Sequence, residues 1–229
     1  MKTIGLLGGM SWESTAMYYQ IINETVKKEL GGLHSAKIIL YSVDFEEIER
    51  YQSSGAWDES ASVLSAAAKR LESAGVDFVV ICTNTMHKIA PQIRAQLSVP
   101  LLHIAEATVE ALKKAKIKKV GLLGTKYTMT QEFYKDVLIE QGVDVLVPDE
   151  MVIEKINEII YDELCVGVMR QSSKRVFLRA MEWLRGRGAQ GIILGCTELG
   201  LLIHPEDIDL PIFDTALIHA KCAAYAAMR

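Results

Sequence analysis

TIGLLG at residues 3–8 and KVGLLG at residues 119–124 decide the fold of this chain. Each is a short, almost uninterrupted apolar run that ends in glycine, which is typical of strands buried on both faces of a parallel sheet. Position 4 and its counterpart at position 120 lie 116 residues apart, about half of the 229-residue chain. Two more pairs recur in the same order: LESAGVDFVVI at 71–81 with LRGRGAQGIIL at 184–194, a shift of 113, and PLL at 100–102 with PIF at 211–213, a shift of 111. Three pairs in register predict two similar halves related by internal duplication.

Short apolar runs alternate with longer amphipathic stretches from end to end. We expect strands at 3–8, 37–43, 77–82, 119–124, 143–147 and 191–195, and helices at 13–30, 58–74, 129–141, 151–165 and 173–186. This alternation predicts an α/β fold with mostly parallel sheets. We place the first lobe at residues 1–98 together with a C-terminal segment of about 211–229, and the second lobe at 99–210.

Composition and charge exclude several classes of protein. The chain is 50% hydrophobic and 24% charged, as globular proteins are, and its net charge of −4 offers no basic excess for nucleic acid or an anionic membrane. No apolar run approaches the roughly 18 residues that a membrane span needs, and the N-terminus lacks the features of a signal peptide. The four cysteines are scattered without a CxxC pair, so we expect no zinc site, no disulfide framework and a reducing, cytoplasmic setting.

The duplication brings two polar tripeptides into correspondence. Under the shift of 113, Thr83 falls on Cys196, Asn84 on Thr197 and Thr85 on Glu198. Both tripeptides follow a buried strand, and open α/β sheets bind their ligands at the carboxyl ends of strands. If the two halves face each other, Thr83 and Cys196 approach one cleft from opposite sides. A two-base reaction on a single carbon requires that geometry.

Cys196 lies in GCTELG (195–200), directly after a strand. We expect Thr197 to cap a helix there, and backbone N–H groups near Thr197 and Glu198 to hold a carboxylate and lower the pKa of the thiol. The alternative is an inert, buried cysteine that packs as a small hydrophobe.

CTNTMH (82–87) is the counterpart of this motif in the first half. Thr83, Asn84 and Thr85 suit a small carboxylate, although such residues also simply cap turns. Strand alternation points Cys82 to the other face, so we read it as a core residue.

The glycine-rich turns GLLGGMS (5–11) and GLLGTKYT (121–128) lack the fingerprints of phosphate-binding loops. A dinucleotide-binding or flavodoxin-like role is therefore disfavoured. We expect these strand ends to line a cleft with backbone and with Met10, Ser11, Thr125 or Thr128. His87 is the one histidine near a predicted strand-end site, and no group of residues has the spacing of metal ligands.

GLLGGMSWEST, ICTNTMHK (81–88), LLGTKYTM (122–129) and GCTELGLL (195–202) together resemble the aspartate/glutamate racemases, over essentially the whole chain. The resemblance is to the bacterial amino-acid racemases, including the L-aspartate/glutamate-specific type with Thr in the first motif. It implies two Rossmann-like (flavodoxin-like) lobes with the site between them. It also implies a homodimer, an amino acid as the small-molecule substrate, and no need for pyridoxal phosphate, metal or any other cofactor.

The same resemblance assigns the site. It implies that Thr83 and Cys196 transfer the proton, and that the residues around the substrate are Met10, Gln52, Asn84, Thr85, Thr125, Thr128, Thr197 and Glu198. Many family members carry Cys in both motifs, whereas this chain has Thr83 in the first. Aspartate racemases also use a basic residue in the region that here reads ELCVG (163–167), where this chain has Cys165.

Other functions remain open from the sequence. Related proteins with one or both cysteine positions are isomerases or decarboxylases of small dicarboxylates, and a two-lobed protein that only binds an amino acid would need no reactive cysteine. A site for aspartate or glutamate needs a second cationic or donor-rich subsite, for which Gln52, Lys88 and Lys126 are the candidates.

Overall fold

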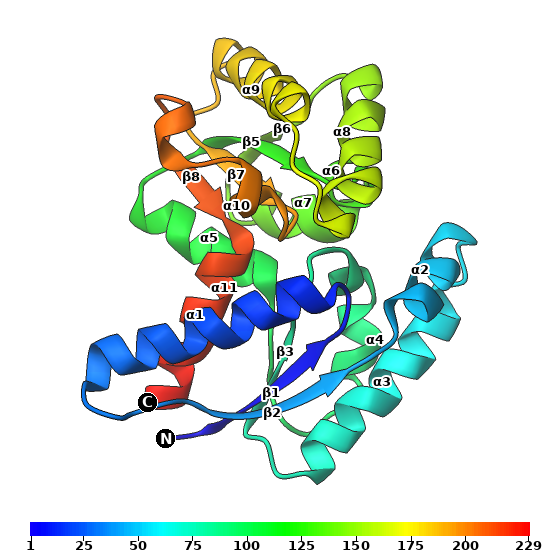
Figure 1. Cartoon of the computed structure of the whole chain (residues 1–229), viewed down its shortest axis with the longest axis vertical. Helices are drawn as coiled ribbons and strands as arrows, with labels where there is room; N and C mark the ends of the chain where they lie inside the picture. The colour runs from blue at the N-terminus through cyan, green and yellow to red at the C-terminus, as the bar shows by residue number, and fades with distance from the viewer. The chain divides into compact units, whose positions relative to one another are not determined.

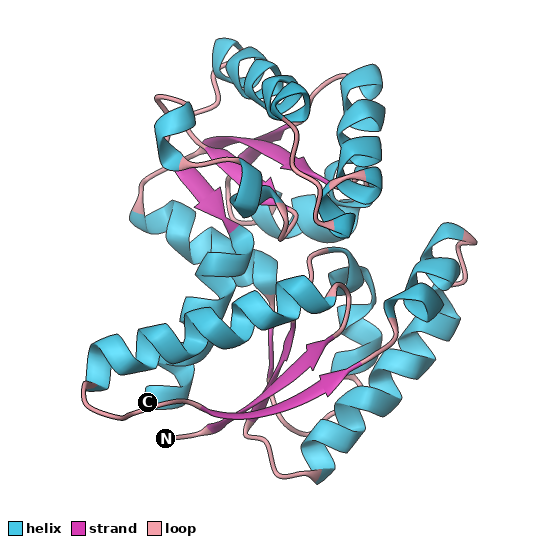
Figure 2. Ribbon diagram, viewed as in Figure 1, coloured by secondary structure: helices cyan, strands magenta, loops and turns pink.

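The computed structural model describes residues 1–229, and the chain divides into two compact units. The first contains Met1–Ile104 and His219–Arg229, and the second contains Ala105–Ile218. Each unit is built on a four-stranded sheet in which every pair of neighbours is parallel. Helices cover both faces of each sheet (Figure 2). The predicted α/β class with parallel sheets is therefore confirmed.

The first unit has the strand order β2-β1-β3-β4, of which β2, β1 and β3 are labelled in Figure 1. Its strands are β1 (Thr3–Gly8), β2 (Lys37–Ser42), β3 (Phe78–Ile81) and β4 (Leu101–Leu102). Its helices are α1 (Trp12–Leu30), α2 (Phe45–Ser53), α3 (Trp57–Ser73), the 3-10 helix Thr85–Ile89 and α4 (Ala90–Arg94). The C-terminal part of α11 (Thr215–Met228), from His219 onward, also belongs to this unit.

The second unit repeats this arrangement with the strand order β6-β5-β7-β8. Its strands are β5 (Lys119–Gly124), β6 (Asp144–Leu146), β7 (Ile192–Gly195) and β8 (Ile212–Asp214). Its helices are α5 (Ile104–Lys114), α6 (Lys126–Thr130), α7 (Glu132–Ile139), α8 (Glu150–Asp162), α9 (Gln171–Gly186), α10 (Leu199–Leu202) and the 3-10 helices Leu164–Val166 and Pro205–Asp207. Equal strand orders in the two units support the duplication that the sequence repeats predict.

Burial explains why the central strands are so apolar. All four residues of β3 and of β7 are buried, and β1 and β5 are exposed only at their first residue. A parallel strand covered by helices on both faces has no position for a solvated side chain. The edge strand β2 is instead partly exposed along its length.

Local signals set the helix ends. The Ser11 hydroxyl accepts a hydrogen bond from the Ser14 N–H at 3.2 Å and so caps α1, a contribution of about 1 kcal/mol. Helix α3 ends just before Gly75, whose φ of 87° suits glycine.

The unit boundaries differ from the expected lobes at the last strand of each sheet. We expected residues 99–102 in the second lobe and residues 211–214 in the first. Strand β4 pairs with β3, with Val79 opposite Leu101, and β8 pairs with β7, with Ile193 opposite Phe213. Each short strand therefore completes the sheet that precedes it in the chain, and the C-terminal contribution to the first unit begins at His219.

The topology marks one place in each sheet where a ligand site belongs. After β1 the chain proceeds to β2 on one side and later crosses to β3 on the other, and β5 does the same between β6 and β7. Open α/β sheets bind ligands beyond the carboxyl ends of the strands at this switch point. No helix of the chain combines the length and apolar character needed to cross a membrane.

Candidate active site

Thr83, Asn84 and Thr85 follow β3 at the switch point of the first sheet, and all three are buried. Two side chains hold this turn by contacting its backbone carbonyl groups. The Ser14 hydroxyl donates to the Cys82 carbonyl at 2.9 Å, and Nδ1 of His87 lies 2.8 Å from the Thr83 carbonyl. Side chains from α1 and from the following 3-10 helix therefore fix the backbone on both sides of the Thr83 side chain.

Cys82 is the core residue that strand alternation predicts. Its side chain is fully buried, and burial raises the pKa of its thiol.

The loop after β1 reaches the same switch point from the neighbouring strand. A Cβ on Gly9, whose φ is 93°, would lie 2.2 Å from the Val43 carbonyl oxygen, so only glycine allows this approach to the chain after β2. The Gly9 N–H donates to the Thr15 hydroxyl at 2.8 Å. Met10 follows and is buried in the hydrophobic core of the first unit. Gln52, on α2, is also buried.

Cys196 and Glu198 are in direct contact at the equivalent place in the second unit. Cys196 follows β7 with 6% of its surface exposed, and its thiol donates to Oε2 of Glu198 at 3.0 Å. The Thr197 hydroxyl donates to the same oxygen at 2.7 Å. One buried carboxylate oxygen therefore accepts two hydrogen bonds, one of them from the thiol.

The predicted direction of the Cys196 pKa is wrong. Burial raises the pKa of the thiol well above its ordinary value, and the negative charge of Glu198, the neighbouring Cys165 and the hydrogen bond to Glu198 raise it further. The backbone N–H of Glu198 lowers it, as expected, but is outweighed. Cys196 therefore rests as a protonated thiol.

Thr197 does not cap a helix, contrary to expectation. Helix α10 begins at Leu199, its N-cap position is Glu198, and no side chain caps it. Thr197 lies one position before this N-cap, and its hydroxyl donates to the Glu198 carboxylate.

Thr125 and Thr128 come from the turn after β5. The Thr125 hydroxyl accepts from the Thr128 N–H, and the two hydroxyl oxygens lie 3.1 Å apart. Thr128 is fully buried, whereas Thr125 retains 6% exposure. A Cβ on Gly195 would lie 3.1 Å from Cγ2 of Thr128, so the glycine before Cys196 lets β7 end against this turn.

The two candidate lysines have different surroundings. Lys126 forms an ion pair with Glu154, which raises its pKa. Nζ of Lys88 lies 3.9 Å from the ring centroid of Trp57, and partial burial lowers its pKa. Lys88 directly follows His87 in the 3-10 helix that begins at Thr85.

A cluster of His87, His103 and His219 is the feature that sequence reasoning missed. The ring centroid of His87 lies 4.5 Å from that of His103 and 5.7 Å from that of His219. Nε2 of His87 accepts from the Ile104 N–H at 3.1 Å, and Nδ1 of His219 lies 2.9 Å from the Tyr18 hydroxyl. Because these residues are far apart in sequence, no local pattern reveals the cluster.

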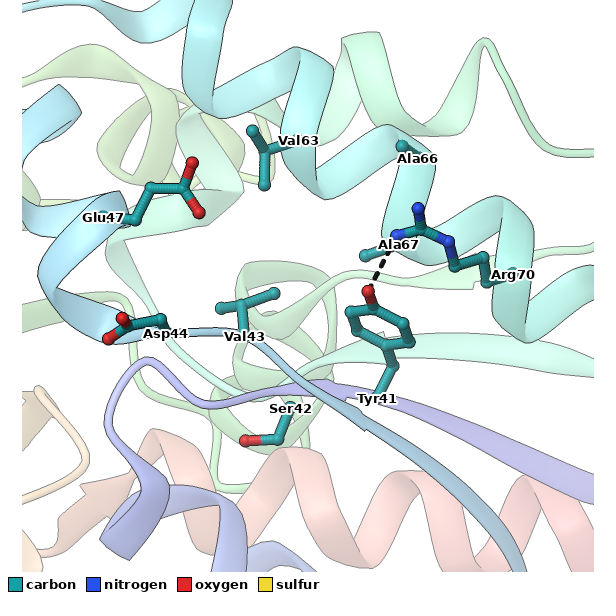
Figure 3. Close-up of a pocket in the computed structure, with 9 residues that line it drawn as sticks. All are labelled: Tyr41, Ser42, Val43, Asp44, Glu47, Val63, Ala66, Ala67 and Arg70. Carbon is teal, nitrogen blue, oxygen red and sulfur yellow. Dashed lines mark hydrogen bonds between the residues drawn. The ribbon is translucent and has the colours of Figure 1, made fainter.

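A pocket of about 380 Å³ lies elsewhere on the first unit, between β2, α2 and α3 (Figure 3). Arg70 points toward the Tyr41 hydroxyl and donates to it at 2.7 Å, while Asp44 and Glu47 lie across the hollow. Both acidic side chains form hydrogen bonds within or at the start of α2. Asp44 accepts from the Glu46 N–H, and Glu47 accepts from the Tyr51 hydroxyl. None of the predicted site residues lines this pocket.

The chain is similar to racemases along its whole length. A family model for Asp/Glu/Hydantoin racemases matches residues 7–223. A solved structure from Yersinia pestis, classed as an Asp/Glu racemase, is 52% identical, with full coverage of both chains and a TM-score of 0.94. An aspartate racemase homologue from Pyrococcus horikoshii OT3 is 35% identical, with full coverage of both chains and a TM-score of 0.88. The broad specificity amino-acid racemase RacX of Bacillus subtilis (strain 168) is 26% identical over 95% of each chain.

Proposed function

Because the chain belongs to the Asp/Glu/Hydantoin racemase family, we propose that it interconverts the enantiomers of aspartate or glutamate, with Cys196 and Thr83 exchanging the Cα proton. Family membership supports the coarser statement, an isomerase of the racemase type. The role of Cys196 in this proposal is supported mainly by one observation, the 3.0 Å contact between its thiol and the Glu198 carboxylate.

In this mechanism, Glu198 is the acceptor of the thiol proton. Glu198 takes the proton from Sγ of Cys196, which leaves a thiolate and a neutral carboxylic acid. The thiolate then removes the Cα proton, so the C–H bond breaks, an S–H bond forms, and the electron pair passes to the α-carbon and its carboxylate. Both groups are buried, so the transfer takes place where water competes little.

Thr83 supplies the second proton in this proposal. Its hydroxyl protonates the opposite face of the α-carbon, and solvent then restores the hydroxyl. Glu198 releases to solvent the proton that it took from Cys196, so all three groups return to their starting forms. A hydroxyl is a usable donor but a very weak base at neutral pH, so the reverse direction, in which Thr83 must accept the proton, is kinetically harder. No pyridoxal phosphate takes part in the proposed steps.

Polar groups next to the two proton-transfer residues suit an acidic amino acid. Asn84 and Thr85 offer an amide and a hydroxyl beside Thr83, and Thr197 lies beside Cys196. Lys88 is the candidate for the side-chain carboxylate, because Lys126 is already paired with Glu154. A cation stacked on Trp57 keeps its charge available to a second partner.

Proton NMR in D₂O tests the substrate and the reaction together. L- and D-amino acids and maleate are incubated with the protein without pyridoxal phosphate or metal, before and after alkylation of cysteine. The proposal predicts deuterium at Cα with inversion of aspartate or glutamate, and its loss on alkylation. Exchange of many amino acids would favour broad specificity. Conversion of maleate alone would favour an isomerase, and binding without turnover a binding protein.

A further inference from the structure

His87 connects the turn that carries Thr83 to the first residue of α5. We propose that His87 is a positioning residue, which holds Thr83 where its hydroxyl can protonate the substrate. This inference rests on the proposed function, because it assigns His87 a role in the second half of the racemisation. The residue acts through the Thr83 backbone and makes no contact with the reacting carbon in this account.

One ring nitrogen of His87 faces a hydrogen-bond donor, and the other faces an acceptor. Nε2 lies 3.1 Å from the Ile104 N–H, which can only donate, so Nε2 must be the unprotonated nitrogen. Nδ1 then carries the proton and donates it to the Thr83 carbonyl at 2.8 Å. A neutral imidazole with the proton on Nδ1 satisfies both contacts, and neither the other tautomer nor the imidazolium does.

The surroundings favour this single neutral form. His87 is 1% exposed, with His103 and His219 as ring neighbours. Burial lowers the pKa of His87 well below its ordinary value, and the two histidines lower it further. The ring therefore stays neutral at physiological pH and keeps one orientation.

The His87 side chain holds the Thr83 turn directly, through the carbonyl of Thr83 itself. Besides the Nδ1 contact to Thr83, the backbone N–H of His87 donates to the Asn84 carbonyl at 3.0 Å. Ser14 holds only the preceding Cys82 carbonyl. Loss of the imidazole would free the turn at the residue whose hydroxyl must meet the substrate. Misplacement by about 1 Å can lower a rate roughly a hundredfold.

Two substitutions separate the two imidazole contacts. His87→Asn keeps a donor near the position of Nδ1, whereas His87→Gln keeps only an acceptor near the position of Nε2. The readout is the ratio of inversion to Cα exchange with retained configuration, measured in D₂O with the enantiomer whose Cα–H faces Cys196. Exchange with retention needs only Cys196, whereas inversion also needs Thr83.

We expect this ratio to fall about tenfold or more in His87→Gln and to stay within about threefold of wild type in His87→Asn. His219→Gln is the matched control. It removes a second buried histidine of the same cluster, which bonds Tyr18 and the Leu102 carbonyl but not the Thr83 turn. General loosening of the cluster would lower the ratio in the control as well.

An unchanged ratio in His87→Gln, or an equal fall in His219→Gln, would overturn the inference while leaving the racemase proposal intact. A wild-type protein that exchanges no Cα proton would reject the proposed function itself, and the role of His87 with it. Nitrogen-15 shifts of wild-type His87 at pH 7 provide a second check that requires no variant to fold. They must report the proton on Nδ1, because a proton on Nε2 cannot be donated to Thr83.

Discussion

The thiol of Cys196 donates a hydrogen bond to the carboxylate of Glu198, 3.0 Å away and buried with it. This contact has two opposing consequences. Burial and, after it, the negative charge of Glu198 raise the pKa of the thiol, which disfavours the thiolate at rest. In the proposed mechanism, the same carboxylate accepts the thiol proton when the substrate binds. Acidity of the thiol and catalytic rate should therefore respond in opposite directions when Glu198 is changed.

Glu198→Gln tests that separation. Removal of the charge should lower the pKa of Cys196, while loss of the proton acceptor should reduce turnover by about a hundredfold. Thiolate absorbance against pH measures the first effect, and Cα exchange in D₂O the second. Glu206→Gln, on an exposed residue of the same unit, is the control. Equal turnover in Glu198→Gln and wild type would exclude Glu198 as the acceptor.

Thr83→Cys should make the two directions of racemisation more alike. A thiol can both donate and accept the proton, whereas the Thr83 hydroxyl only donates well. The equilibrium between enantiomers is fixed, so kcat/KM must still balance, and the change should appear in the separate kcat and KM values. We expect the two kcat values to converge to within about threefold, as polarimetry from each pure enantiomer measures. Unchanged asymmetry would count against Thr83 as the second group.

Lys88→Met should weaken the preference for acidic substrates. Methionine keeps an apolar stem over Trp57 and removes the charge, so KM for aspartate and glutamate should rise about tenfold, while kcat changes little. Lys126→Met removes a lysine that is already paired with Glu154 and serves as the control. An equal rise in KM in both variants would show that the loss of one positive charge anywhere on the protein is enough, and that Lys88 forms no specific subsite.

Stability should fall as the pH drops below about 6.5, because His219 and His87 are buried as neutral rings. Burial lowers the pKa of His219 to about 3 and that of His87 well below its ordinary value. The unfolded chain therefore binds more protons than the folded one below pH 6.5, and each histidine lowers the free energy of unfolding by about 1.4 kcal/mol per pH unit. Urea unfolding at pH 7.5, 6 and 5 measures this slope.

His219→Gln should reduce the slope of unfolding free energy against pH by the contribution of one histidine, about 1.4 kcal/mol per pH unit. The range from pH 7.5 to 5 lies above the ordinary titration of carboxylates, so it isolates the histidines. A slope unaffected by the substitution would show that His219 is protonated in the folded protein.

Gly195→Ala should destabilise the second unit by about 1–3 kcal/mol. The added Cβ would lie 2.9 Å from Cδ1 of Leu122 and 3.1 Å from the Leu123 carbonyl oxygen, at the end of the strand that carries Cys196. Gly186→Ala is the control, because no atom lies within 4 Å of its Cβ and alanine favours the helix there. Chemical unfolding compares the two variants, and equal stability would contradict the packing described for β7.

The central strands could be predicted from sequence because they are buried on both faces. Strands β1 and β5 begin and end where their apolar runs do. The strands β4 and β8 are only two and three residues long, too short for any periodicity, although the repeat containing them was visible. Helix α2 was missed because its sequence, FEEIERYQS, is mostly charged or polar and buries only Ile48 and Gln52.

The candidate site was predictable only in part. Strand ends and duplication identify Thr83 and Cys196, because both signals are local in the sequence. The pKa of Cys196 depends on the burial of its thiol and on the direction of the Glu198 side chain. The histidine cluster forms only where residues from separate elements meet. Sequence spacing contains neither piece of information.

The time course of L-aspartate or L-glutamate in D₂O, followed by proton NMR and chiral analysis for wild type and Cys196→Ala, shows whether Cys196 carries the reaction. If Cys196 is the base, the wild type produces a D-enantiomer that carries solvent deuterium at Cα from the first turnover. Cys196→Ala then shows neither exchange nor inversion. Racemisation by Cys196→Ala at the wild-type rate would contradict this role of Cys196.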